Sequence, residues 1–147
     1  MNDDPLEQFT TAATTPYQPP DLPNISMIKL IASSTNYDGK VVRVEGFLEL
    51  EFESTILYLH REDYEQMIDR NGLWVEVSDA IWGRKYELTE RYVSVTGTFR
   101  ANFRGHMDAC SGAITSIQDV RPKAKREEIE AIVQAAREKA EGGNSPK

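Results

Sequence analysis

Alternating apolar and polar residues predict five short β-strands between residues 40 and 120. The longest alternating segment, residues 40–52, places valine, leucine and Phe52 side chains on one face and mostly charged side chains on the other. Gly46 interrupts this segment, and a glycine inside a long strand is typical of the bend at a barrel corner. Four further strands are predicted at residues 55–60, 73–77, 92–99 and 113–120. Five strands, the first long and bent, predict a mainly β, five-stranded Greek-key barrel.

Apolar residues at helical spacing predict helices on both sides of the strands. Residues 27–31 begin a short helix, and residues 61–70 hold one or two helical turns before Gly72. Residues 78–90 and 101–111 are predicted as mostly loop. A C-terminal helix over about residues 125–140 carries one apolar stripe, made of Ile129, Ile132, Val133, Ala136 and Ala140. We expect this stripe to pack on the barrel or on a second copy of the chain, because a lone short helix is marginally stable. The fold class is therefore α+β.

Composition divides the 147 residues into three parts. Residues 1–23 hold five of the seven prolines and few large apolar side chains, which predicts a disordered arm. Residues 24–122 contain every predicted strand and form a single barrel domain of ordinary size. Residues 123–147 form the C-terminal helix and a flexible tail.

The charge distribution favours a basic protein partner over nucleic acid. The net charge of −7 divides into −4 on residues 1–22, −4 on residues 23–122 and +1 on residues 123–147. The predicted barrel therefore lacks the basic excess that phosphate backbones require. The longest apolar run is far shorter than the roughly 20 residues that cross a membrane. The acidic first residues lack the pattern of a secretory signal, so we expect a cytoplasmic protein without a membrane partner.

The segment from Tyr37 to Phe47, with the sequence YDGKVVRVEGF, resembles the Y-x-G-K-x-V-x-V-x-G opening of a family of small bacterial OB-fold domains. Later segments resemble the same family: LYLHREDY from residue 57, NGLW from residue 71, YVSVTGTF from residue 92, and GHM from residue 105 followed by Ser111-Gly112. The resemblance covers about residues 26–120 and implies an OB-fold-like barrel, but it implies no established activity. Where the family motif continues with glycine after Met107, this chain has Asp108, so the motif does not imply a tight turn here.

Two histidines and one cysteine are the candidates for metal or catalytic chemistry. His60 and His106, together with Asp63, Asp108 or Cys110, are sound zinc or iron ligands by residue type. His106 and Cys110 are also spaced as a base and a nucleophile. A third orienting group, an oxyanion motif and a phosphate-binding glycine loop are not evident. The sequence therefore predicts a non-catalytic protein without a metal or cofactor, and Cys110, the only cysteine, excludes an internal disulfide.

Acidic and aromatic residues on the outward strand faces predict a protein-binding surface. Aromatic side chains inside an acidic rim suit a partner that carries lysine and arginine. The predicted partner-binding residues are Glu45, Phe47, Glu49, Glu51, Trp74 and Glu76. A second possible site is the loop that carries Arg104, His106, Met107 and Asp108.

These features predict a protein-binding module of the bacterial cytosol, one concrete form of which is an immunity-type protein that neutralises a basic toxin. The alternative is a domain that binds single-stranded nucleic acid or a small ligand, because OB barrels often bind single strands. The candidate stacking residues are then Phe47, Tyr58 and Trp74, and the candidate phosphate contacts are Arg43, Arg100 and Arg104. The glutamates on the same faces argue against this alternative, because each would repel a phosphate.

Overall fold

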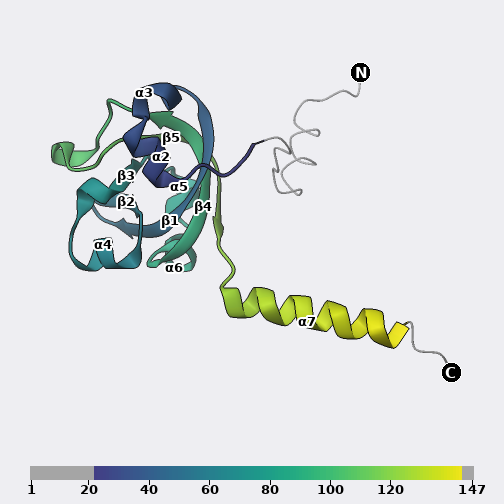
Figure 1. The fold of residues 1–147 in the computed structure, drawn as a ribbon. Helices are drawn as coiled ribbons and strands as arrows, with labels where there is room; N and C mark the ends of the chain where they lie inside the picture. Colours follow the sequence, from purple (N-terminus) through teal and green to yellow (C-terminus); the bar gives the residue numbers. More distant parts are fainter. Residues whose placement is uncertain (1–21, 144–147) are drawn as a thin grey trace, which may run out of the picture.

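The computed structural model describes residues 22–143, so the predicted N-terminal arm, except for its last two residues, lies outside the described part. Five strands form one mixed sheet whose hydrogen bonds close into a ring in the order β1-β2-β3-β5-β4. Only the β3–β5 pair is parallel. Figure 1 shows the sheet wrapped around a common interior. The strands are β1 (Val41–Glu51), β2 (Ser54–Tyr58), β3 (Gly72–Val75), β4 (Arg91–Arg100) and β5 (Ala113–Pro122).

Strand β1 belongs to both halves of the closed sheet. Its first part, from Val41 to Leu48, pairs with β4, and its last part, from Phe47 onward, pairs with β2. Gly46 lies just before this change of partner, and a Cβ added there would come 2.5 Å from the Tyr58 carbonyl oxygen. The pairing of β1 with β4 runs without a register shift through Gly46. The glycine therefore permits the close approach of β2, and the unbroken register shows that the predicted bend at Gly46 is not a β-bulge.

Two short helices precede β1, and further short helices lie in the connections between the strands. They are α2 (Met27–Ala32), α3 (Ser34–Tyr37), α4 (Arg61–Glu65), η1 (Asp69–Asn71), α5 (Asp79–Trp82), α6 (Lys85–Leu88) and η2 (His106–Asp108). The prediction that residues 78–90 are mostly loop was wrong, because α5 and α6 lie there. Ser78 caps α5 by accepting a hydrogen bond from the Ile81 amide, and the two helices bury Ile81 and Leu88 in the core.

The core lies inside the closed sheet and is almost wholly aliphatic. Val42, Val44, Leu48 and Leu50 point inward from β1, as their alternation predicts, and Phe99 is the largest side chain fully buried with them. Helix α2 adds Met27 and Leu30 to this core. Phe52 does not continue the inward series, because β1 ends at Glu51 and Phe52 lies in the turn with 83% of its surface exposed.

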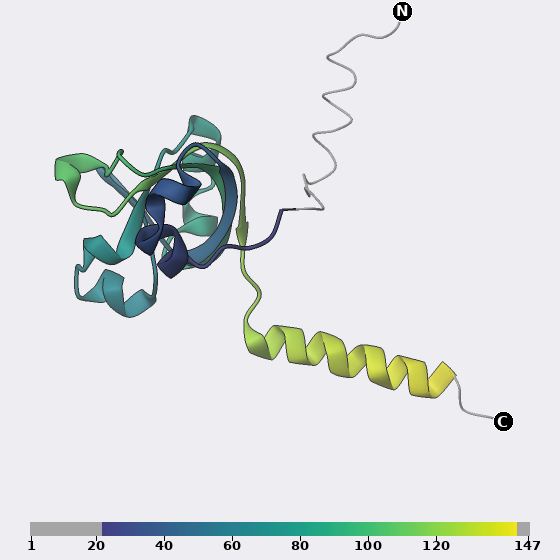
Figure 2. The ribbon, with the colours of Figure 1, turned by 45° about the horizontal axis from the view of Figure 1, so that its top comes forward.

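The C-terminal helix α7 (Arg126–Gly143) projects away from the closed sheet, as Figures 1 and 2 show. Every side chain described from Lys123 to Gly142 is exposed. The expectation that its apolar stripe packs on the sheet of the same chain was therefore wrong, whereas packing on a second copy stays a prediction. Within residues 22–143, no helix has both the length and the apolar character needed to cross a membrane.

Candidate functional site

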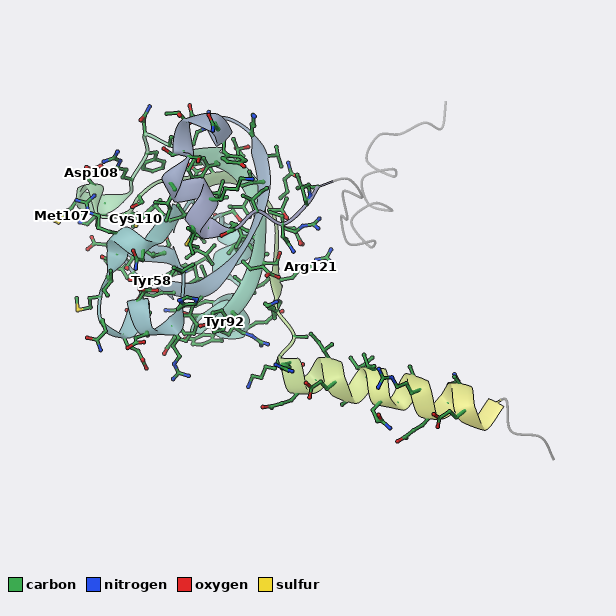
Figure 3. The ribbon with its side chains drawn as sticks, in the orientation of Figure 1. Tyr58, Tyr92, Met107, Asp108, Cys110 and Arg121 are labelled. Carbon is green, nitrogen blue, oxygen red and sulfur yellow. The ribbon has the colours of Figure 1, made fainter. Side chains whose placement is uncertain are left out.

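A second apolar cluster covers the outer face of β1, β2 and β3. We call it the outer cluster; its buried members are Phe47, Ile56, Tyr58 and Cys110, with Tyr64 and Trp74 packed against them. The strand register builds it, because Phe47 pairs with Tyr58 and Ile56 pairs with Trp74 across neighbouring strands. Figure 3 shows Cys110 between Tyr58 and the tip of the 101–112 loop, which Met107 and Asp108 mark. Part of the outer face of the sheet is therefore buried under side chains from other segments and is not accessible to a partner.

Phe47 and Glu49 point outward from β1, as alternation predicts, but they are not surface residues. Phe47 is only 3% exposed because the rings of Tyr64 and Tyr92 cover it, with centroids 5.4 and 5.3 Å away. Glu49 is 8% exposed and accepts a hydrogen bond of 2.7 Å from the Ser54 hydroxyl. The expectation that both side chains are exposed to a partner was wrong, because alternation does not show what another segment lays over a strand.

The outer cluster is surrounded by carboxylates. Burial raises the pKa of the Glu49 carboxyl group above its usual value, and the negative charges of Glu51, Asp69 and Glu90 raise it further. Burial also raises the pKa of the Tyr64 hydroxyl group, with added contributions from Glu90, Glu51 and Glu49. Several negative charges therefore act on the same outward face, which makes an approaching cation favourable and an approaching phosphate unfavourable.

A hollow of about 380 Å³ opens beside this cluster, between the β1–β2 turn and the segment from β3 to α5. We call it the acidic hollow. Four carboxylate residues line it: Glu51, Glu53, Glu76 and Asp79. Three aromatic residues line it as well: Phe52, Trp74 and Trp82. Neither lysine nor arginine is among its lining residues.

The carboxylates of the acidic hollow are free of ion pairs within residues 22–143. Glu51, Glu53 and Asp79 are exposed. The Glu76 carboxylate accepts a hydrogen bond of 3.3 Å from the Ser116 backbone amide, which holds it against β5. Four unpaired negative charges around one concave surface attract a lysine or arginine side chain.

The aromatic residues of the acidic hollow differ in how they are held. Trp74 is half-buried, and Gly105 packs so closely on its indole that an added Cβ would lie 2.4 Å from Cε3. Trp82 is 38% exposed, and the Lys85 ammonium group lies 5.0 Å from its ring centroid. Phe52 stands at the tip of a turn in which Glu53 has φ of 64°. The hollow thus presents one fixed indole and two accessible rings, and Trp82 already accepts a cation from its own chain.

The remaining predicted partner residues lie elsewhere. Glu45 forms an ion pair of 3.3 Å with Lys123 and lines a different hollow with His60 and Tyr92. Of the predicted set, Glu51, Trp74 and Glu76 therefore meet at one place, whereas Glu45 does not join them.

The predicted loop site is a separate, exposed feature. Arg104 lies 3.8 Å from Asp108 and forms an exposed ion pair with it, and His106 is exposed. Met107 is exposed with φ of 56°, and Asp108 follows with φ of 57°. Both residues thus have left-handed backbones although neither is glycine. The loop contributes to the site described above mainly through Gly105, which covers Trp74.

The Cys110 thiol is not arranged as a nucleophile. It is fully buried, and burial together with the nearby Asp69 charge raises its pKa to about 12. The thiolate that would attack a substrate is therefore scarce at neutral pH. Among the residues that the structure describes, His, Cys, Asp and Glu side chains form no group of three that could hold a metal ion.

Sequence reasoning missed Phe52, Trp82 and Asp79 as members of the site. The last two lie on α5, inside the segment predicted as loop, and Phe52 was assigned to the core. The available signal was Ser78 followed by Asp79, which is typical of a helix start. That helix brings Trp82 to the same hollow as Trp74.

Comparison of the chain with protein-family models gave no match. Comparison with curated proteins gave none either.

Proposed function

We propose that this chain is a non-catalytic OB-fold binding module whose acidic hollow takes a lysine- or arginine-bearing segment of another protein. The observation that carries the proposal is one hollow lined by three aromatic residues, by four carboxylates that form no ion pair within residues 22–143, and by neither lysine nor arginine, with Lys85 already lying over the ring of Trp82. Aromatic rings bind cationic side chains by their faces, and carboxylates add charge attraction at the rim.

The OB-fold assignment draws support from three features of the sheet. The ring order is β1-β2-β3-β5-β4, β3 and β5 run parallel, and β1 pairs with strands of both halves. The hollow also borders the outer face of β2 and β3, where OB barrels commonly bind their ligands. In a small acidic bacterial protein, a narrower form of the proposal is an immunity-type protein that covers the basic active site of a toxin.

The nucleic-acid alternative fits this surface less well. A single-stranded nucleic acid needs stacking rings inside a positively charged groove. Here the rings stand among carboxylates, and Phe47, one of the expected stacking residues, lies beneath Tyr64 and Tyr92. Each bound phosphate would approach an uncompensated negative charge.

Selection from a random dodecapeptide display library tests the proposal and does not require that the partner be identified first. We expect the wild-type chain to enrich peptides rich in lysine and arginine. The double variant Glu51→Lys/Glu76→Lys should lose this enrichment, because it reverses two charges of the acidic hollow. The control, Glu138→Lys/Glu141→Lys, makes the same change of net charge on exposed positions of α7.

Two outcomes of the selection contradict the proposal. One is an enriched set without basic residues. The other is an equal loss in the hollow variant and in the α7 variant, which would show that overall charge and not the hollow attracts the peptides. Trp82→Ala then tests the aromatic part, because Trp82 is partly exposed and its removal should weaken binding far more than folding.

A further inference from the structure

The exposed helix α7 carries an apolar stripe that no part of the closed sheet covers. Ile129, Ile132 and Val133 are 47%, 67% and 42% exposed, and the helix stands clear of the sheet in both views (Figures 1 and 2). At 3.6 residues per turn, Ala136 and Ala140 continue the same stripe toward the C-terminal end. Most of the stability of a helix in a protein comes from the packing of its apolar face, so a second helix along the stripe would stabilise α7.

We propose that α7 pairs in antiparallel orientation with α7 of a second copy of this chain. The stripe follows the alternating spacing of three and four residues that two paired helices require, with Ile129 and Ala136 at one kind of position and Val133 and Ala140 at the other. An antiparallel pair sets Ile129 against Ala140 of the second copy and Val133 against Ala136. Each large side chain then meets a small one, so the two helices can approach closely.

The charges beside the stripe favour the antiparallel over the parallel arrangement. Glu130 and Arg137 flank the same side of the stripe, seven residues apart. Because seven residues span about 10.5 Å along a helix, the two side chains are not neighbours on one helix. In the antiparallel pair, each Glu130 faces Arg137 of the second copy, which gives two ion pairs. In a parallel pair, Arg137 would instead face Ile132, and the cation nearest Glu130 would be Lys125, which lies before the first residue of α7.

The apolar area of the stripe is small, so we expect the dimer to be weak. Five apolar residues, two of them alanine, bury much less than the roughly 800 Å² per partner of a standard stable interface. The helix pair should therefore dissociate on dilution, with a Kd on the order of 10–100 µM. If the proposed function also holds, such a dimer displays two acidic hollows and gains avidity for a partner with two basic segments.

Sedimentation velocity of the full chain, from micromolar to submillimolar concentration at physiological salt, tests the pairing. We expect the mass to rise from monomer to dimer with concentration. Val133→Glu should raise the Kd at least about tenfold, which is about 1.4 kcal/mol. Ala131→Glu is the matched control, because it places the same charge on the face opposite the stripe and should leave the Kd within about twofold. Glutamate favours helix more than valine does, so a change of helix propensity alone would not produce the effect of Val133→Glu.

A charge exchange tests the orientation. Arg137→Glu should weaken the dimer, since it places two glutamates opposite each other while the Arg126–Glu130 pair of 2.7 Å within the helix stays intact. Adding Glu130→Arg should restore association above that of Arg137→Glu alone. A chain that stays monomeric at submillimolar concentration overturns the proposal. So does a dimer that Val133→Glu leaves intact, or a double variant without recovery.

Discussion

Gly105 is the residue at which a single methyl group should disturb the site most. Its backbone has φ of 77° and ψ of −162°, a conformation that is essentially restricted to glycine and costs other residues about 1–3 kcal/mol. An added Cβ would also lie 2.4 Å from Cε3 and 2.5 Å from Cδ2 of Trp74. Trp74 packs against the outer cluster, so its ring cannot move aside without opening that cluster, and such overpacking typically costs about 1–3 kcal/mol.

The two costs together predict that Gly105→Ala lowers the free energy of unfolding by about 3 kcal/mol. For a chain of this size, the midpoint of thermal unfolding should then fall by roughly 10 °C. Circular dichroism melts measure this change. In a Trp82→Phe background, the fluorescence of Trp74 should also shift to longer wavelength, because the displaced loop exposes the indole to water.

Gly142→Ala is the matched control for this experiment. Gly142 lies on exposed α7 with nothing within 4 Å of an added Cβ, so the same chemical change should not lower the melting midpoint. A Gly105→Ala midpoint within about 2 °C of wild type would refute the close packing of Gly105 on Trp74. In a Trp74→Ala background, Gly105→Ala should cost only its backbone part, and simple additivity of the two changes would contradict the contact.

Three further changes test other parts of the structure. Gly46→Ala should destabilise by about 2 kcal/mol or more in urea unfolding, because its Cβ would lie 2.5 Å from the backbone carbonyl oxygen of Tyr58, which cannot rotate away as a side chain can. A neutral result would place β2 farther from β1. The raised pKa of Glu49 means that the folded state holds this proton more tightly than the unfolded state, so its contribution to stability is lost as pH rises through the folded pKa. Glu49→Gln should therefore gain stability over wild type between acid and neutral pH, and parallel stability curves would contradict the burial. Asp63→Ala should cost about 2 kcal/mol, because the buried carboxylate accepts bonds of 2.9 Å from the His60 amide and from Asn71; Asp63→Asn, which keeps one acceptor, should cost less.

The strands could be predicted from the sequence because one face of each strand lines the same core, which makes apolar and polar residues alternate. Val42, Val44, Leu48 and Leu50 fill the core as expected, and β1 begins and ends within one residue of its predicted bounds. The predicted length of β1 is also what allows it to pair with both β4 and β2. These features depend on the two-residue alternation of apolar and polar side chains, which can be read directly from the sequence.

The candidate site could be predicted only in part because other segments cover or complete it. Phe47 was expected to be exposed, but Tyr64 of the α4 segment and Tyr92 of β4 cover it. Trp74, on an outward strand face, is half-buried, because Gly105 of the 101–112 loop packs on its indole. These contacts join residues 17 to 45 positions apart in the sequence, and they follow from the topology, which no local pattern displays.

The most direct test of the central claim is a comparison of two labelled probes by fluorescence anisotropy at physiological salt. One probe is a lysine- and arginine-rich peptide recovered from the display selection, and the other is a mixed-sequence single-stranded DNA. We expect the peptide to bind the wild-type chain with micromolar affinity and the double variant Glu51→Lys/Glu76→Lys to bind it at least about tenfold more weakly. We expect no measurable binding of the DNA. Micromolar binding of the DNA that weakens steeply with salt, together with peptide binding that the double variant leaves unchanged, would contradict the proposed function.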